Sequence, residues 1–434
     1  MDTVFFHIEQ PCAEARYALR HLFGTMAGRK AEEVLQLNEF RALEGPKVFY
    51  GMKGVAGALH LMPCINGAEG AALSLDPDVG EWQGIPVLFP VSGGDVPFDP
   101  VAGTFFHLAR TEEDRLPTDE HGRPETAAMH AARHNYLHRP VVDEWLIAIN
   151  AAWRAKDPHV PQLNRSYGQT ATMDADNGVM YLGRPLWRTL GGMARDLGKG
   201  RPSRLIDRLA TLTGSRLDPY AIHGAFLRMA KAGGARAIVN FIAAPRGEHD
   251  HAVEIGRATM RKVLNLVMRE AELGLHPGYG SSVNAGSITA EKAALEKITH
   301  APVHISRQHF LRFRTPQTQR ELLACGISEE HSMGLADRTG FRAGTCTPYP
   351  FFDRIRKAET ALMVHPFAVM DSALAYKMEL SPVEAVQEAK RMVDAVRKVN
   401  GRFISVWHER FLSGYGDEQG WEVVAPEVIA YARP

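Results

Sequence analysis

The sequence has little of several features that mark common protein classes. It holds only four cysteines in 434 residues, and no two of them form a CxxC pair. This scatter does not fit a zinc knuckle or a disulfide framework, and free thiols are typical of a reducing compartment. No apolar run reaches about 18 residues, so we expect no membrane-spanning helix. The opening "MDTVFFHIEQ" lacks a secretory pattern, and we therefore expect a cytoplasmic protein.

An excess of one charge is also missing. Lys+Arg and Asp+Glu number 50 each, and no long basic block stands out, so nucleic acid is not the expected partner. Hydrophobic residues make up 45% of the chain and charged residues 23%, as in ordinary soluble globular proteins. A chain of this length exceeds what one compact core usually holds, which favours two domains.

The first part of the chain, residues 1–155, mixes short apolar runs such as "KVFYG" and "GIPVLFPVSGG" with glycine and proline breaks. This pattern predicts a small α/β domain, which the amphipathic helix "VVDEWLIAINAAWRA" would close. Residues 117–139 are polar and rich in turn formers, so we expect a solvated loop or a domain edge there. The alternative is a metal site, because His130 and His134 stand four residues apart.

The second part, residues 156–434, alternates between strand-like and helix-like segments. The strand-like segments are "TATMDAD", "ARAIVNFIAA", "LGLHP", "VHISRQHFL" and "RFISVWHE". The helix-like segments between them include "HAVEIGRATMRKVLNLVMREAEL", "TAEKAALEKIT" and "SPVEAVQEAKRMVDAVRKVNG", the last opening with a capping box at Ser381 and Glu384. Such alternation predicts an α/β fold, either a parallel (β/α) barrel or a doubly wound sheet.

Carboxylates recur at the predicted strand ends, where an α/β barrel places its active site. Asp174 and Asp176 stand two residues apart, so on a regular strand they share one face. Two close carboxylates repel each other unless a cation or a proton separates them. A divalent metal bound by Asp176, with Asp174 as the base, removes this conflict. The alternative is a turn or helix cap, which "DADNG" would also suit.

Imidazoles recur there as well. His276 in "GLHPGYGSS" would be a turn histidine if it stood alone, but with Asp176 it forms a pair of natural zinc ligands. The predicted third ligand is His309, at the end of the next predicted strand. His408 in "SVWHE" is a candidate general acid or a buried hydrogen-bonded histidine, and His365 is a weaker candidate for the same role.

Two arginines and a further aspartate complete the candidate set. Arg307 and Arg342 are fixed cations that either orient a carboxylate or oxyanion or form structural ion pairs. Asp371 in "FAVMDSAL" lies in another strand-end segment. We predict a catalytic role for Arg307 and substrate contacts for Arg342 and Asp371.

The order of these motifs resembles the polysaccharide deacetylase superfamily, also called the NodB-homology or carbohydrate esterase family 4 group. The resemblance rests on "TMDAD", "GLHPGYGSS", "SRQHFLRF", "GFRAGTC", "MDSALAY" and "SVWHE", and on an N-terminal region like that of a divergent bacterial branch. It implies a distorted (β/α) barrel at residues 156–434 after an N-terminal α/β domain at 1–155. It also implies metal-dependent removal of acetyl groups from N-acetylated sugars.

The resemblance also suggests roles for individual residues. It maps a base followed by a metal ligand onto Asp174 and Asp176, an arginine onto Arg307 and a histidine onto His408. In the family's HxxxH motif His276 matches the first histidine, but Gly280 occupies the second position, so His309 or water would complete the metal shell. Zinc is the expected ion and a carbohydrate the expected substrate. Two alternatives are a non-catalytic barrel that binds a glycan or a partner, and a hydrolase of another C–N bond.

Overall fold

The computed structural model describes residues 3–64 and 74–434. Its first 156 residues contain a small parallel sheet in the order β2-β1-β3-β4 and an antiparallel hairpin. The strands are β1 (Thr3–Ile8), β2 (Lys30–Glu33), β3 (Lys47–Tyr50), β4 (Leu59–Leu61), β5 (Val79–Trp82) and β6 (Ile85–Leu88). The helices are α1 (Ala13–Arg20), α2 (Leu37–Ala42), α3 (Pro100–Leu108), α4 (His130–Arg133) and α5 (Val141–Lys156).

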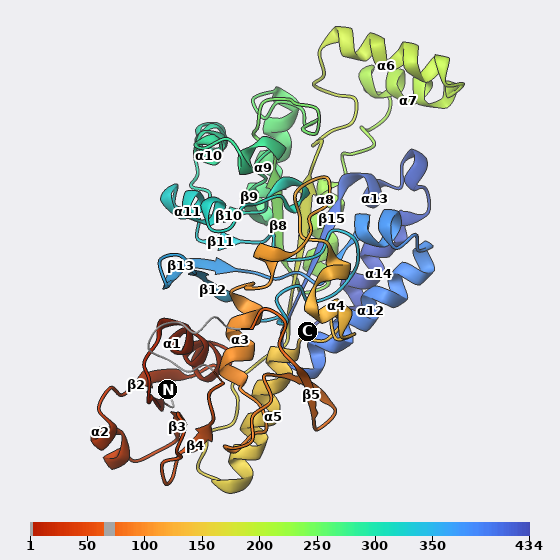
Figure 1. The fold of residues 1–434 in the computed structure, drawn as a ribbon. Coiled ribbons are helices and arrows are strands. Elements are labelled where there is room, and N and C mark those ends of the chain that lie inside the picture. The colour runs from red at the N-terminus through yellow and green to blue at the C-terminus, as the bar shows by residue number, and fades with distance from the viewer. Residues whose placement is uncertain (1–2, 65–73) are drawn as a thin grey trace.

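The rest of the chain is arranged around a nine-stranded sheet in the order β12-β13-β11-β10-β9-β8-β7-β15-β14 (Figure 1). All neighbours are parallel except β12, which runs antiparallel to β13. The strands are β7 (Gly168–Ala175), β8 (Arg236–Phe241), β9 (Glu272–Leu275), β10 (Ile305–Ser306), β11 (Glu329–Glu330), β12 (Tyr349–Asp353), β13 (Ala358–Val364), β14 (Val369–Met370) and β15 (Arg402–His408). The mixed α/β class predicted from the alternation is therefore present.

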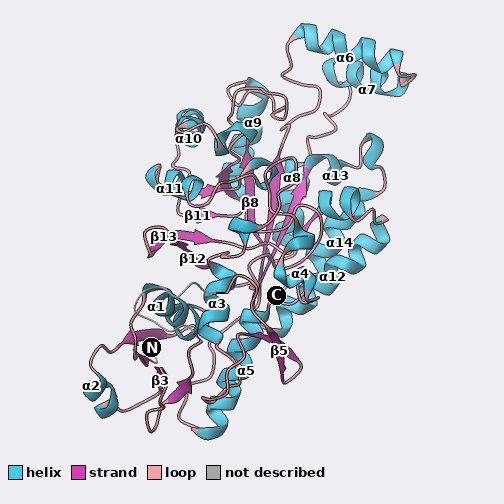
Figure 2. Cartoon of the chain, in the orientation of Figure 1, coloured by secondary structure: helices cyan, strands magenta, loops and turns pink. Residues whose placement is uncertain are grey.

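Helices flank this sheet, as the cyan and magenta colouring of Figure 2 makes plain. They are α8 (His223–Ala232), α9 (Ala258–Glu270), α10 (Ser287–Thr299), α11 (Gln317–Ala324), α12 (Pro382–Lys398), α13 (Glu409–Ser413) and α14 (Val424–Tyr431). The predicted capping box is formed, since Ser381 and Glu384 exchange hydrogen bonds at the start of α12. Among the described residues, no helix combines the length and the apolar character that crossing a bilayer requires.

The two ends of the parallel strand array come together through one short segment. After β13 the backbone N–H of His365 donates to the carbonyl of Glu330 in β11, and the N–H of Phe367 donates to that of Met333. One residue later the N–H of Ala368 donates to Ile404 in β15, at the other side of the array. Single hydrogen bonds, rather than a strand pair, thus connect the two sides in the described part of the chain.

Three local expectations were wrong. The helix predicted from residue 251 begins only at Ala258, because the preceding segment is irregular, ends in a turn and is held by a hydrogen bond from the N–H of Val253 to Asn177. The strand predicted as "VHISRQHFL" is two residues long, and His309 opens a short 3-10 turn instead. Residues 117–139 are not all solvated, because His130 is fully buried.

A further pair of helices, α6 (Leu186–Gly198) and α7 (Pro202–Leu212), was not expected. They form a hairpin that stands away from the sheet, at the top of Figure 1, and follows the carboxyl end of β7. In both helices polar side chains are buried and large apolar side chains are exposed, the reverse of an ordinary surface helix.

Candidate metal centre

Asp174 is the second-last residue of strand β7 and is buried between charged and polar partners. Its Oδ1 accepts hydrogen bonds from Arg307 Nη1 at 2.9 Å and from Asn240 Nδ2 at 2.8 Å. Burial alone would raise the pKa of this carboxyl, but the charge of Arg307, followed by those of nearby histidines, outweighs burial and lowers the pKa below its usual value. Asp174 is therefore held as a carboxylate.

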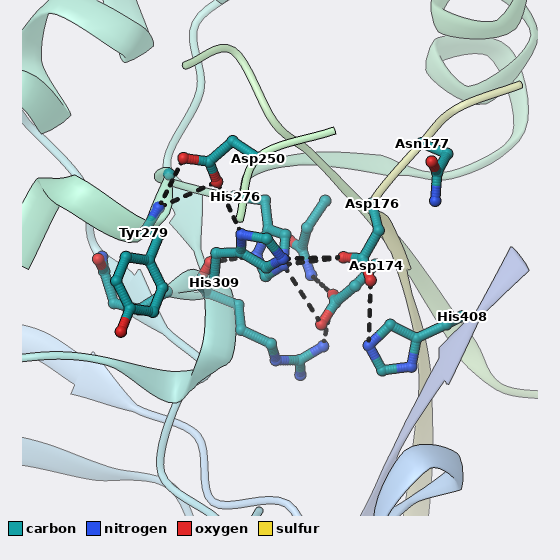
Figure 3. A network of polar contacts seen from close by, with 12 residues as sticks. Asp174, Asp176, Asn177, Asp250, His276, Tyr279, His309 and His408 are labelled. Atoms are coloured by element: carbon teal, nitrogen blue, oxygen red, sulfur yellow. Dashed lines mark hydrogen bonds and ion pairs between the residues drawn. The ribbon is translucent and has the colours of Figure 1, made fainter. Parts of the chain in front are cut away.

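Asp176, His276 and His309 converge just beyond the strand ends (Figure 3). Asp176 Oδ1 lies 3.6 Å from His276 Nε2 and 3.5 Å from His309 Nε2. Asp176 follows β7 directly, His276 follows β9, and His309 starts the turn after β10. The parallel array thus brings together, from three separate segments, the three residues that the sequence singled out as ligands.

The second nitrogen of each histidine is already engaged. His276 Nδ1 lies 2.5 Å from the carbonyl oxygen of Arg307, and His309 Nδ1 lies 2.8 Å from Asp250 Oδ1. A carbonyl or carboxylate oxygen can only accept, so each Nδ1 carries a hydrogen, and the Nε2 atom of each ring is the one that faces Asp176 and would bind a metal. This is the arrangement in which ligating histidines are usually held by a second partner.

With both Nε2 atoms deprotonated, as metal binding requires, the three inward-facing atoms would have lone pairs and no donor between them. Asp176 Oδ1 is buried and has no hydrogen-bond partner among the described residues. Such an unsatisfied oxygen beside two imidazole nitrogens is costly unless a proton or a cation lies among them. The donor set of one carboxylate and two imidazoles suits zinc and similar divalent ions, so the residues present fit a metal.

His408 lies across from this group at the end of β15. Its Nδ1 is 2.6 Å from Asp371 Oδ1, its backbone N–H donates to Asp371 Oδ2, and its Nε2 is 4.0 Å from Asp176 Oδ2. Burial alone would lower the pKa of His408, but Asp371 and then Asp176 outweigh it and raise the pKa to about 9. At neutral pH the imidazole is therefore a cation.

Three neighbours of the site were given no role by the sequence reasoning, although Asn240 and Asp250 stood among the polar residues at a predicted strand end. Arg410 donates to Asp176 Oδ2 at 3.1 Å, Asp250 fixes the ring of His309, and Asn240 contacts Asp174. Arg410 stands two positions after His408, so the end of the last strand carried a signal for it. Nothing in the spacing of Asp250 indicated which histidine it would hold.

A pocket of about 250 Å³ opens over these residues, and the N-terminal region forms part of its wall. His121 and Arg123 line it although they lie far from the other lining residues in sequence. His121 Nδ1 is 3.1 Å from the Tyr279 hydroxyl, and Arg123 donates to the carbonyl of Phe310 at 3.1 Å. The segment predicted as a solvated loop or domain edge therefore reaches the candidate site.

The two residues predicted to contact substrate lie elsewhere. Asp371 is fully buried behind His408 and does not line the pocket. Arg342 lines an adjoining pocket of about 280 Å³, where Glu113 takes up its guanidinium in two hydrogen bonds of 2.8 and 2.9 Å. Both contacts fit positioning within the protein better than recognition of a ligand.

The alternative metal site at His130 and His134 has less to offer. His130 Nδ1 lies 2.6 Å from the Tyr136 hydroxyl and its Nε2 lies 2.8 Å from the carbonyl of Pro77. Both ring nitrogens are therefore occupied, although Asp76 lies near enough to complete a group of three.

Comparisons with known proteins give limited guidance. A family model described as "Family of unknown function (DUF7033)" matches residues 4–158, and the search of curated proteins found no match. Among solved structures, the chain is similar to a protein from Mycobacterium smegmatis assigned as a polysaccharide deacetylase, with 13% identity, a TM-score of 0.39, and coverage of 61% of this chain and 83% of that one.

Two further solved structures are similar to parts of the chain. A family 4 carbohydrate esterase from Streptomyces lividans, in complex with acetate, shows 9% identity and a TM-score of 0.30 over 62% of this chain and 88% of that one. A 7,8-dihydropteroate synthase from Vibrio fischeri ES114 shows 10% identity and a TM-score of 0.28 over 62% and 93%. All three scores are below 0.5, so none of these structures carries an argument about function.

Proposed function

We propose that this protein is a metal-dependent hydrolase that removes the acyl group from the nitrogen of an N-acetylated sugar. The observation that carries the proposal is the unsatisfied Asp176 Oδ1 facing two oriented imidazole nitrogens, those of His276 and His309. These three residues would hold the ion, for which zinc is our choice. The proposal includes the domain division at 155/156 and a barrel-like closure of the sheet.

The chain's own residues supply an acid and a base on either side of this ligand group. When bound, the metal would polarise the acyl carbonyl and bring the pKa of a bound water toward neutrality. Asp174, kept ionised by Arg307, would accept the proton of the attacking water. His408, kept protonated by Asp371, would donate a proton to the departing amine. In this scheme Arg307 and Asp371 position the two groups that exchange protons.

The acid and base are also suited to an amide rather than an easier leaving group. An amine leaves only if it is protonated, and a pKa of about 9 keeps His408 charged at neutral pH. The choice of a sugar rests on the motif resemblance and on the pocket over the site, which the ring of Tyr376 borders. Arg342 takes no part in this scheme, because Glu113 satisfies its guanidinium.

The test measures metal content and acetate release on the full chain. We expect about one equivalent of zinc by elemental analysis, and release of acetate from N-acetylglucosamine oligomers. Asp174→Asn should keep the zinc and lose activity by roughly 100-fold or more, since it removes the base. The matched control Asp394→Asn changes a carboxylate at the surface of α12 and should leave both unchanged.

Each other outcome favours a different reading. Protein that takes up no zinc would refute the hydrolase and leave a binding protein. Zinc without acetate release from any N-acetyl sugar, but with turnover of another amide, would favour a hydrolase of a different C–N bond. Activity that survives in Asp174→Asn would refute the assignment of the base.

A further inference from the structure

A second pocket, about 300 Å³ in volume, lies beneath the α6–α7 hairpin and is lined by cations. Its basic side chains are Arg184, Arg188, Arg195, Arg208, Arg246 and His251. The remaining lining residues are neutral, and no carboxylate of the described residues lines the pocket. In a chain whose charges sum to zero, five guanidinium groups around one small volume are a marked local excess.

Few of these charges are neutralised. Arg208 pairs with Asp196 at 2.7 Å and lies over the ring of Tyr181. Arg184 donates to backbone carbonyls, at 2.5 Å to that of Met180. In the described ranges 3–64 and 74–434, the guanidinium groups of the other three, Arg188, Arg195 and Arg246, make no hydrogen bond or ion pair.

Like charges held this close repel one another. Burial lowers the pKa of Arg184 from its usual value, and the charges of Arg246 and Arg208 oppose its protonation further, with Asp218 acting the other way. The pKa of His251 is lowered by burial, then by Arg246 and Arg184, while Asp250 opposes this shift. An anion in the pocket would convert this repulsion into attraction.

The hairpin is built to face this pocket with its polar side. The buried residues of α6 are Thr189, Gly192 and Asp196, and those of α7 are Arg208 and Thr211. A Cβ on Gly192 would lie 2.8 Å from the guanidinium of Arg208, so the glycine leaves room for that side chain. The apolar residues point outward instead: Trp187, Leu190 and Ile206 are 72%, 55% and 65% exposed.

The pocket adjoins the candidate metal centre. Asn177 lines it and directly follows Asp176, and Figure 3 places the Asn177 side chain on the far side of Asp176 from His276. Glu409 accepts the N–H groups of Asn177 and Gly178, which fixes the start of the loop between the two sites. The linings of the two pockets therefore meet at the consecutive residues Asp176 and Asn177.

We propose that this pocket binds a phosphate or diphosphate group of the substrate. The inference rests on the proposed function and narrows its substrate class to N-acetylated sugars that carry such a group. Guanidinium groups bind phosphate oxygens through paired hydrogen bonds, and several converging ones suit a diphosphate better than a single carboxylate. The sugar would then lie toward Asp176, with its acetamido group over the metal centre.

The first test measures the binding of inorganic pyrophosphate to the whole chain by calorimetry at physiological ionic strength. We expect saturable binding that is weakened at least 10-fold in the double variant Arg188→Gln/Arg246→Gln, whose guanidinium groups have no hydrogen bond or ion pair to lose, although that of Arg188 lies over the ring of Trp187. The control Arg338→Gln/Arg356→Gln removes two exposed arginines elsewhere and should bind as the native chain does. Zinc content measured on all three proteins separates loss of the pocket from loss of the fold.

Three results would overturn the inference: no saturable binding to the native chain, equal weakening in the control, or no weakening in the double variant. Because this measurement needs no turnover, pyrophosphate binding without any acetate release would refute the proposed function and leave the pocket standing. Acetate release without pyrophosphate binding would do the reverse.

A second set of assays distinguishes the source of the phosphate. A nucleoside-diphosphate-linked N-acetyl sugar is compared with an isoprenyl-diphosphate-linked one in detergent micelles. The outward apolar side of the hairpin makes the lipid-linked probe a necessary arm. In either case we expect a higher KM in Arg188→Gln/Arg246→Gln for the probe that is the substrate. Equal KM values for variant and native protein on both probes would overturn the inference.

Discussion

Of the three groups of one carboxylate and two histidines in the described residues, two lie in the second part of the chain and are alike in geometry, yet their surroundings differ. Asp176, His276 and His309 form one group, and Glu329, His331 and His365 form the other. In the second group Glu329 Oε2 lies 3.2 Å from His331 Nε2 and 3.4 Å from His365 Nε2, much as in the first. Donor types and distances alone therefore do not distinguish them.

The difference lies in what else binds each carboxylate. Arg236 donates to both oxygens of Glu329, at 2.8 and 3.1 Å, so that carboxylate already has a cation, which it shares with Glu272. Asp176 Oδ1 has no such donor among the described residues, and Arg410 reaches only its Oδ2. Arg307 separates the groups, donating to Asp174 on one side and to the carbonyl of His331 on the other.

The histidines respond accordingly. Around Glu329 burial prevails and lowers the pKa of His331 to about 4 and of His365 to about 2. At the first site burial also acts to lower the pKa of His276, but Asp174 and Asp176 outweigh it and raise that pKa. The first group attracts positive charge, whereas the carboxylate of the second is already paired with an arginine. This contrast is why we place the metal at Asp176.

The largest expected effect is the loss of metal from one group but not the other. His276→Ala removes a ligand and should abolish stoichiometric zinc binding, whereas His331→Ala should leave it unchanged. Elemental analysis after dialysis measures both variants against the native chain. Zinc retained in His276→Ala and lost in His331→Ala would reverse the comparison.

A smaller effect is expected one step away from the ligands. Asp250→Asn replaces the carboxylate that holds Nδ1 of His309 with a neutral amide, so the ring should be oriented less firmly. We expect the affinity for zinc to fall by about 10–100-fold. Competition with a chromophoric chelator measures the change. Arg236→Lys at the second group serves as the matched control, because it disturbs an equivalent carboxylate contact. An unchanged affinity in Asp250→Asn would argue against His309 as a ligand.

How much of this the sequence could predict depended on the distance between partners along the chain. Asp174 and Asp176 could be placed because a strand fixes which residues share a face, and His276 and His408 because they end apolar runs. Arg342 was given a substrate role because Glu113, which satisfies it, lies far away in sequence. His365 was considered as an acid, and only the fold places it beside Glu329.

The reversed hairpin was missed for a different reason. Its apolar residues recur at helical spacing, but that pattern indicates burial, whereas Trp187 and Leu190 are exposed. Likewise, no periodicity could show that His121 reaches the pocket, because its contact with Tyr279 depends on how the N-terminal region packs against the sheet. Contacts set by packing between distant segments leave no local signal.

The next effect concerns acid stability. The pKa of His331 is about 4 in the folded state and about 6.5 in the unfolded state. Between pH 6.5 and about pH 4 the unfolded chain therefore binds a proton at His331 that the folded chain does not bind. The native protein therefore loses stability as the pH falls through this window. His331→Gln lacks this loss and should gain on the native chain by about 1–2 kcal/mol between pH 6.5 and 5. Urea unfolding at both pH values measures the free energy of unfolding of the variant and of the native chain. If the difference between the two proteins is the same at both pH values, His331 does not titrate as described.

The smallest effect would come from making the second group resemble the first. Arg236→Gln removes the cation that balances Glu329 and leaves its carboxylate facing two neutral imidazoles. We expect this variant to gain a second, weak zinc site, since the donor set is then complete and unbalanced. Calorimetry in the presence of saturating zinc at the first site would detect it, and His331→Ala added to Arg236→Gln should abolish it. If Arg236→Gln binds no additional zinc, charge balance is not what separates the two groups, and the solvent-facing pocket over Asp176 would have to account for the difference instead.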